Sequence, residues 1–221
     1  LACRQLAQWA TAPATAVWTL AVNVSAQEFR QPDFVEQVLA ALRDAAANPR
    51  LLKLELTESL LLHDVEDSIL KMQALRTLGV GFSLDDFGTG YSSLSYLKRL
   101  PLDQLKIDQS FVRDMLDDRD DLAIVQGVVG LSKAFNRKVI AEGVESRAQM
   151  ALLRRHFCDE IQGFHLSRAL TAADLGKLVL ENRAQPTRPA ADDRNVQTLL
   201  IVDDDPNVLA ALHRLFRRDN Y

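Results

Sequence analysis

Short apolar runs rich in β-branched residues alternate with segments of helical period through most of this 221-residue sequence. That alternation is typical of repeated strand–helix units on a parallel sheet, and it places the chain in the α/β class. Six strands are expected, at Trp18–Val24, Leu51–Leu56, Val80–Leu84, Leu105–Ile107, Val139–Ala141 and Asp159–Gln162. One expected helix carries Phe34, Val38 and Leu42 on a single face, and Asp33 with Glu36 predicts a capping box at its start.

Composition narrows the class of partner. Lys plus Arg number 26 and Asp plus Glu number 30, for a net charge of −4, so no broad basic surface for DNA or an anionic membrane is expected. The two cysteines, Cys3 and Cys158, are too few for a disulfide-stapled secreted domain. No apolar run approaches the roughly 18 residues of a membrane span. We therefore expect a cytoplasmic protein with no membrane span in this segment.

Polar side chains stand at or near the carboxyl ends of the expected strands, where ligands gather in α/β sheets and barrels. They are Asn23, Glu55, Asp85, Asp86, Lys106, Glu142, Glu145 and Gln162. Carboxylates at this density repel one another unless cations compensate, and a set made of oxygen ligands suits Mg²⁺ or Mn²⁺ rather than zinc. Adjacent carboxylates such as Asp85 and Asp86 can serve two ions that clamp a phosphate ester, with Lys106 orienting or helping to activate water.

Each of these residues also has an ordinary structural interpretation. A single acid at a strand end is more often a helix cap or a solvated loop residue, and Asp85-Asp86 alone could form an Asx turn before Gly88. Glu58 and Glu145 could likewise cap the helices that follow them. The complete set is harder to explain as caps, because Lys106 lies inside an apolar strand where an unpaired charge is costly. We therefore favour a metal-dependent site acting on a phosphate ester.

Six segments together resemble the EAL-domain family, over about residues 1 to 180. They are Val22–Ser25, Leu54–Ser59, Asp85–Leu94, Leu105–Asp108, Ala141–Glu145 and Ile161–Gly163. The resemblance implies a TIM-like barrel that hydrolyses one phosphodiester of the second messenger cyclic di-GMP to give linear pGpG. It also implies Mg²⁺ or Mn²⁺ as the cofactor, with two ions in the site.

The resemblance assigns roles to individual positions. Asn23, Glu55 and Asp85 match metal ligands, with Asp85 bridging and Asp86 serving the second ion. Lys106 matches the lysine that contacts the hydrolytic water. Glu142 matches a glutamate of the metal shell that is proposed to aid water activation. Glu145 and Gln162 match residues that face the site. Glu58 matches a glutamate that braces the loop Phe87–Leu94. The family uses that loop in substrate-dependent dimerisation, so a homodimer is expected.

The sequence also departs from the family pattern. The Glu-Ala-Leu tripeptide, whose Glu is a metal ligand, does not occur, and neither do the first two barrel strands. The expected fold is therefore an incomplete TIM-like (β/α) barrel with six of eight strands. The chain opens without Met in what reads as the middle of an amphipathic helix, so we expect an upstream segment and little or no activity from these residues alone. The alternative is a degenerate EAL module that binds cyclic di-GMP or a protein partner without turnover.

The sequence after Asn182 has a different character. Residues 183–197 are polar and contain Pro, as a linker does, and they follow the EAL-like part at residues 1–182. Residues 198–221 begin with an apolar run that leads into Asp203-Asp204-Asp205-Pro206 and resemble the first strand–helix unit of a flavodoxin-like receiver domain. The resemblance implies that Asp203 and Asp204 form an acidic Mg²⁺ pocket and that a histidine kinase addresses the receiver in a phosphorelay. The alternative is an Asp-capped helix after a strand.

Overall fold

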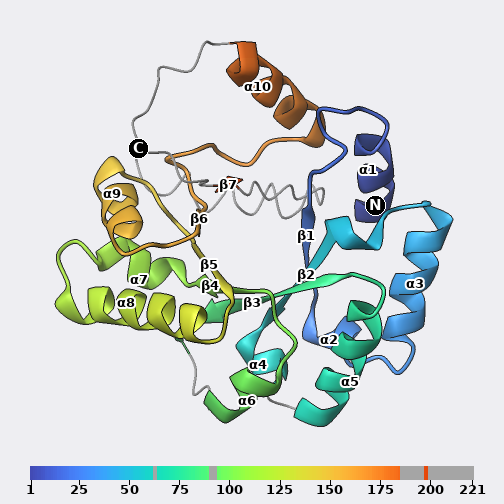
Figure 1. Ribbon diagram of the computed structural model, residues 1–221, viewed down its shortest axis with the longest axis horizontal. Helices are drawn as coiled ribbons and strands as arrows, with labels where there is room; N and C mark the ends of the chain where they lie inside the picture. The colour runs from blue at the N-terminus through green and yellow to red at the C-terminus, as the bar shows by residue number, and fades with distance from the viewer. Residues whose placement is uncertain (62–63, 90–93, 185–196, 199–221) are drawn as a thin grey trace.

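The computed structural model describes residues 1–61, 64–89, 94–184 and 197–198, with side chains described as far as residue 178. Its centre is one parallel sheet whose strands follow each other in chain order. The strands are β1 (Leu20–Asn23), β2 (Leu52–Thr57), β3 (Gly81–Phe87), β4 (Gln104–Ile107), β5 (Lys138–Ala141), β6 (Glu160–Ile161) and β7 (Gln197–Thr198). Figure 1 shows that the sheet curls, so that its strands line the inside of a partial barrel.

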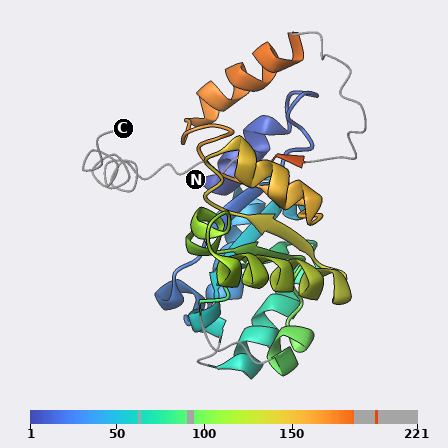
Figure 2. The ribbon, with the colours of Figure 1, turned by 90° about the vertical axis from the view of Figure 1, so that its left-hand side faces the viewer.

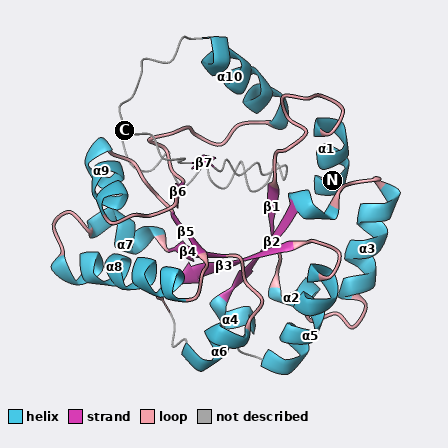
Figure 3. Cartoon of the chain, viewed as in Figure 1, coloured by secondary structure: helices cyan, strands magenta, loops and turns pink. Residues whose placement is uncertain are grey.

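Helices surround the convex side of this sheet, as Figure 3 shows by secondary structure. They are α1 (Ala2–Trp9), α2 (Ala26–Phe29), α3 (Phe34–Asp44), the short 3₁₀ helix η1 (Pro49–Leu51), α4 (Glu58–Leu61), α5 (Val65–Arg76), α6 (Leu94–Arg99), α7 (Gln109–Asp114), α8 (Arg119–Ala134), α9 (Arg147–Arg155) and α10 (Ala172–Ala184). The side view in Figure 2 has α8 and α9 in front of the strands, and α8 packs on β4 and β5. No helix in the described part of the chain is long and apolar enough to cross a membrane.

The two faces of the strands differ in character. Side chains alternate between faces along a strand, and every second residue here is apolar and no more than 4% exposed. These residues are Leu54, Leu56, Phe82, Leu84, Leu105, Ile107 and Val139. They form the core with buried helix residues such as Met72, Leu75 and Val125. The intervening positions carry mostly polar side chains, so the concave face of the sheet is polar.

The α/β class and a partial barrel of parallel strands are confirmed, and all six expected strands are present. β6 is shorter than expected, with only two residues in the ladder. Gln197 and Thr198 pair in parallel with β6 at the junction of the expected linker and receiver segments. The expected acidic pocket, Asp203 and Asp204, lies outside the described residues.

Candidate active site

Lys106 stands at the centre of the concave face, at the end of β4. Its ammonium Nζ lies 2.8 Å from Glu55 Oε2, 3.0 Å from Asp85 Oδ1 and 2.6 Å from Glu142 Oε1. Lys106 is 1% exposed and Glu55 2% exposed. The four side chains come from the neighbouring strands β2, β3 and β4 and from the residue after β5. One ammonium and three carboxylates are therefore in direct contact, as their positions near the strand ends predict.

The register of the sheet explains this convergence. Glu55 lies on β2 and Asp85 on the neighbouring strand β3, which pair in parallel over five residues. Glu142 directly follows Ala141, the last residue of β5. The Glu142 N–H donates to the carbonyl of Ile107, which ties the segment after β5 to the end of β4. Because parallel strands present the same edge, residues at their carboxyl ends gather without help from long loops.

A register shift in β3 brings two consecutive aspartates to the same side. The step from Leu84 to Phe87 covers three residues, whereas the paired step from Leu105 to Ile107 on β4 covers two. In a regular strand, neighbours point to opposite faces. Here the extra residue, together with the positive φ of 54° at Asp86, places carboxylate oxygens of Asp85 and Asp86 within 4.8 Å of each other. Positive φ is uncommon for a residue other than glycine and marks a locally strained backbone.

Charge is unbalanced in this cluster. Burial raises the pKa of the Glu142 carboxyl to about 7, against the opposing attraction of Lys106. Burial also raises the pKa of Glu55. Burial acts to lower the pKa of Lys106, but the attraction of Glu142, Glu55 and Asp85 outweighs it, and the pKa of the ammonium is raised. One ammonium is shared among three carboxylates, so the lysine stays positive, while its charge does not offset the effect of burial on Glu55 and Glu142.

The donor set fits a divalent cation. Carboxylate oxygens of Asp85, Asp86 and Glu142 all lie within 4.8 Å of one another, a spacing that can hold an ion. Within the described ranges, Glu55 Oε1 is buried and has no hydrogen-bond partner, and a buried oxygen of this kind is costly unless a ligand meets it. Oxygen ligands are those that Mg²⁺ and Mn²⁺ prefer.

The other expected residues stand at the ends of their strands or in the segments that follow them. Asn23 is exposed and is paired in register with Glu55 at the end of β1. Gln162 follows β6, with Oε1 buried and unbonded among the described residues. Glu145 is exposed, and its N–H donates to Gln149 Oε1 in the capping arrangement of α9.

Glu58 opens α4 directly after β2. It is 5% exposed, and both carboxylate oxygens lack a hydrogen-bond partner within the described ranges, which do not include residues 90–93. The contact of Glu58 with the loop Phe87–Leu94 stays a prediction, because residues 90–93 of that loop lie outside the described ranges.

Asp108 is a site neighbour for which sequence reasoning predicted no role. Its Oδ1 accepts from the Ser110 N–H at 2.8 Å and so caps α7. Burial raises the pKa of Asp86, and the charge of Asp85, the charge of Asp108 and a hydrogen bond with Asp108 raise it further. The signal was present, since an Asp directly after a strand and before a helix stands at the same sheet edge as the other acids.

The family model for the EAL domain matches residues 1–169. The chain belongs to the EAL domain family. Its EAL domain is 45% identical over 174 residues to the bifunctional diguanylate cyclase/cyclic di-GMP phosphodiesterase MucR of Pseudomonas aeruginosa, an alignment that covers 79% of this chain and 25% of MucR. The chain thus spans about a quarter of the length of this curated relative.

Solved structures of EAL domains have the same architecture. A structure of the MucR phosphodiesterase in complex with c-di-GMP matches with a TM-score of 0.76 and 45% identity, over 79% of this chain and 70% of that one. Klebsiella pneumoniae BlrP1, in a manganese and cyclic di-GMP complex, matches with a TM-score of 0.67 and 31% identity, over 76% of this chain and 42% of that one. The described part of this chain therefore has the fold of the matched part of these EAL structures.

Proposed function

We propose that this EAL domain hydrolyses cyclic di-GMP to linear pGpG with two divalent cations, Mg²⁺ or Mn²⁺. The observation that carries the proposal is the contact of one buried ammonium with three carboxylates beside a fourth, Asp86. This excess of negative charge needs cations, and cations at that edge of a barrel give a site for a phosphodiester. The complexes of MucR and BlrP1 with cyclic di-GMP support the choice of substrate.

Five residues would hold the cations: Asn23, Glu55, Asp85, Asp86 and Glu142. Divalent ions bound there supply positive charge that favours ionisation of water and offsets the negative charge on the phosphodiester. Asp85 would bridge two ions, a role that its contact with the Lys106 ammonium, shared with Glu55, and its proximity to Asp86 support. Glu55 Oε1, buried and unbonded among the described residues, supports a ligand role for that carboxylate.

Lys106 acts as a cation and not as a base, since contact with three carboxylates raises its pKa. It donates hydrogen bonds that can orient the attacking water and stabilise charge on the phosphoryl oxygens. Without metal, burial raises the pKa of Glu142 to about 7. Its carboxylate, in contact with Lys106, is proposed to accept the proton of water. These two residues are the proposed catalytic pair.

The reaction balances as a hydrolysis. The oxygen of one water bonds to phosphorus, the bond from phosphorus to the 3′ oxygen breaks, and the 3′ oxygen takes a proton. One water adds and one phosphodiester opens, which gives pGpG with a 5′ phosphate. Gln162 and Glu145, in the segments after β6 and β5, are proposed to face the substrate, and the Gln162 Oε1, which has no partner in the described part of the chain, supports that role.

Product analysis tests the proposal. The intact protein that carries this chain is incubated with cyclic di-GMP and Mn²⁺, and nucleotides are separated by chromatography and identified by mass. We expect pGpG with Mn²⁺ and none with a chelator. The matched controls are Lys106→Met, which removes a proposed catalytic group, and Arg113→Met, which removes an exposed arginine of α7. Binding of cyclic di-GMP without product at saturating metal would instead support the degenerate, binding-only module.

The organisation of the protein around the domain remains a prediction. We propose a cytoplasmic homodimer through the loop Phe87–Leu94, braced by Glu58, whose buried carboxylate has no hydrogen-bond partner among the described residues and so supports a contact. We also propose the division into residues 1–182, 183–197 and 198–221, with Asp203 and Asp204 in the acidic Mg²⁺ pocket of a receiver domain that a histidine kinase addresses. The test is whether a phosphoryl analogue such as beryllium fluoride changes the rate of pGpG formation, and no change would overturn the coupling.

A further inference from the structure

A second layer of polar side chains lies on the concave face, two residues earlier along the strands than the site. Lys53 precedes Glu55, Ser83 precedes Asp85, and Gln104 precedes Lys106 in this way, because side chains alternate along a strand. We call Lys53, Ser83, Gln104, Lys138 and Glu160 the lower polar layer. None of its members lies in the six segments that carry the family resemblance.

Hydrogen bonds link this layer across the inside of the sheet. Lys53 Nζ on β2 donates to Gln104 Oε1 on β4 at 2.8 Å. Gln104 Nε2 donates to Glu160 Oε2 on β6 at 2.6 Å, and Lys138 Nζ donates to Glu160 Oε1 at 3.0 Å. Gln104 is fully buried, and Glu160 is 5% exposed. The network therefore connects alternate strands β2, β4 and β6, which have no ladder bonds with each other.

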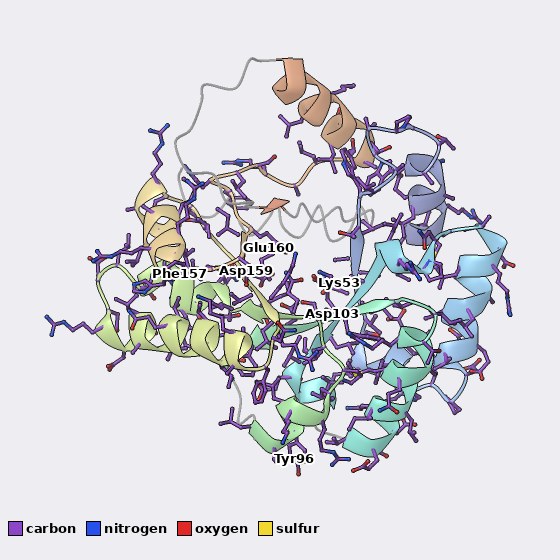
Figure 4. The ribbon with its side chains drawn as sticks, viewed as in Figure 1. Lys53, Tyr96, Asp103, Phe157, Asp159 and Glu160 are labelled. Atoms are coloured by element: carbon purple, nitrogen blue, oxygen red, sulfur yellow. The ribbon has the colours of Figure 1, made fainter. Side chains whose placement is uncertain are left out.

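The residues just before Gln104 and Glu160 bond to the neighbouring strand and so fix how far each strand is shifted along it. Asp103 Oδ2 accepts the Phe82 N–H of β3, and Asp159 Oδ2 accepts the Val139 N–H of β5, both at 2.9 Å. The same device thus occurs at the starts of β4 and β6. Figure 4 shows the labelled Lys53, Asp103, Asp159 and Glu160 gathered in the middle of the curled sheet, whereas Tyr96 and Phe157 lie in its outer ring.

Stability alone does not explain a buried polar network at this place. Well-packed apolar side chains of similar volume are often as stabilising as a buried ion pair or more so, and the convex face of the same strands is apolar. What such a network adds is directional geometry, because each bond fixes two side chains at one distance. The site above needs that geometry, since Lys106 must meet carboxylates from both of its neighbouring directions at 2.6 to 3.0 Å.

We propose that Gln104 and Glu160 are positioning residues: their hydrogen bond with each other, together with the bond from Lys53 to Gln104, sets the spacing of β2, β4 and β6 and thereby places Lys106 against Glu55. The proposal rests on the proposed function for its kinetic consequence, but its structural consequence can be measured without turnover. Gln104 is two residues from Lys106 on the same strand, and its partner Lys53 is two residues from Glu55.

The test replaces both residues by apolar ones of similar length in the double variant Gln104→Met/Glu160→Met. We expect a cooperatively folded protein whose kcat falls about tenfold or more, with a KM changed less, and whose Mn²⁺ affinity, read by electron paramagnetic resonance, also weakens about tenfold. The conservative variant Glu160→Gln keeps an acceptor for Gln104 and should retain most of both. Ser132→Ala is the control for loss of a buried polar group, because this hydroxyl donates to the Val128 carbonyl within α8 and lies outside the lower polar layer.

Two results would overturn the proposal: wild-type kcat and Mn²⁺ affinity in the folded double variant, or an equal loss in Ser132→Ala. If the double variant does not fold, Gln104→Asn shortens the side chain by one methylene and must give the same split between kcat and KM. If the wild-type protein forms no pGpG, the proposed function fails, and Mn²⁺ affinity in the same variants still decides whether these residues position the site.

Discussion

The two polar layers inside the curled sheet use the same kinds of side chain but balance their charges differently. In the lower polar layer, one carboxylate, Glu160, accepts hydrogen bonds at both of its oxygens, from Gln104 and from Lys138, and Lys53 donates to Gln104. We call Lys106, Glu55, Asp85, Asp86 and Glu142 the upper layer. There the single ammonium of Lys106 contacts three carboxylates, and one oxygen of Glu55 has no partner among the described residues. A closed network stabilises geometry, whereas an open one with excess negative charge leaves room for cations and substrate.

Loss of the central ammonium should have the largest effect. Lys106→Met removes the only cation that contacts Glu55, Asp85 and Glu142 in the described structure. We expect pGpG formation to fall about 10²–10³-fold, and the free energy of unfolding in metal-free buffer to fall by about 3 kcal/mol. Assays of kcat and denaturant titrations measure both. Wild-type pGpG formation by Lys106→Met would show that catalysis does not depend on this ammonium.

Removal of the proposed base should cost less than removal of the lysine. Glu142→Gln keeps the size of the side chain but cannot accept a proton, and we expect kcat to fall about 100-fold with little change in the KM for cyclic di-GMP. Steady-state kinetics at saturating Mn²⁺ measure the two separately. A raised KM with unchanged kcat would assign Glu142 to substrate binding instead.

The free energy of unfolding should depend on pH through Glu142. The pKa of Glu142 in the folded protein, about 7, lies above the ordinary value of 4.5. The folded state therefore binds this proton more tightly than the unfolded state, so the contribution to stability is present below the ordinary pKa and is lost as the pH rises through about 7. Denaturant titrations without metal at pH 5.5 and 8 measure this loss. The loss should be smaller in Glu142→Gln, and an unchanged profile in that variant would contradict the assignment.

The smallest effect is expected at the outer end of the lower layer. The side chain of Lys138 is 54% exposed where it pairs with Glu160. Exposed ion pairs contribute little, so Lys138→Met should change the free energy of unfolding by less than about 1 kcal/mol. A much larger loss, measured by denaturant titration, would mean that Glu160 depends on this partner more than on Gln104.

The strands could be predicted from the sequence because apolar residues alternate with helical segments, and the parallel order then places the strand ends together. The bulge at Asp85 and Asp86 could not, since it depends on how β3 pairs with β4. The expected capping box at Asp33 was wrong: its φ of −96° and ψ of 14° are not the extended backbone of a cap, and it forms no side-chain cap bond. Such a box occurs instead at Ser25 and Glu28.

The lower polar layer was missed for a related reason. Lys53, Gln104 and Glu160 lie 51 and 56 residues apart along the chain, and each resembles an ordinary polar residue at the start of a strand. Only the curl of the sheet brings them together. The site above was easier to predict because its residues are acidic, dense and at the ligand-binding edge, whereas the sharing of Lys106 among three acids required the structure.

Titration with Mn²⁺, followed by electron paramagnetic resonance, tests the difference between the layers most directly. The intact protein is compared with Asp85→Asn, which alters the upper layer, and Asp114→Asn, which alters an exposed aspartate of α7. We expect saturable Mn²⁺ binding that Asp85→Asn weakens at least tenfold and Asp114→Asn leaves unchanged. Equal affinity in all three proteins, or no binding to the intact protein, would contradict the existence of a cation site among these carboxylates.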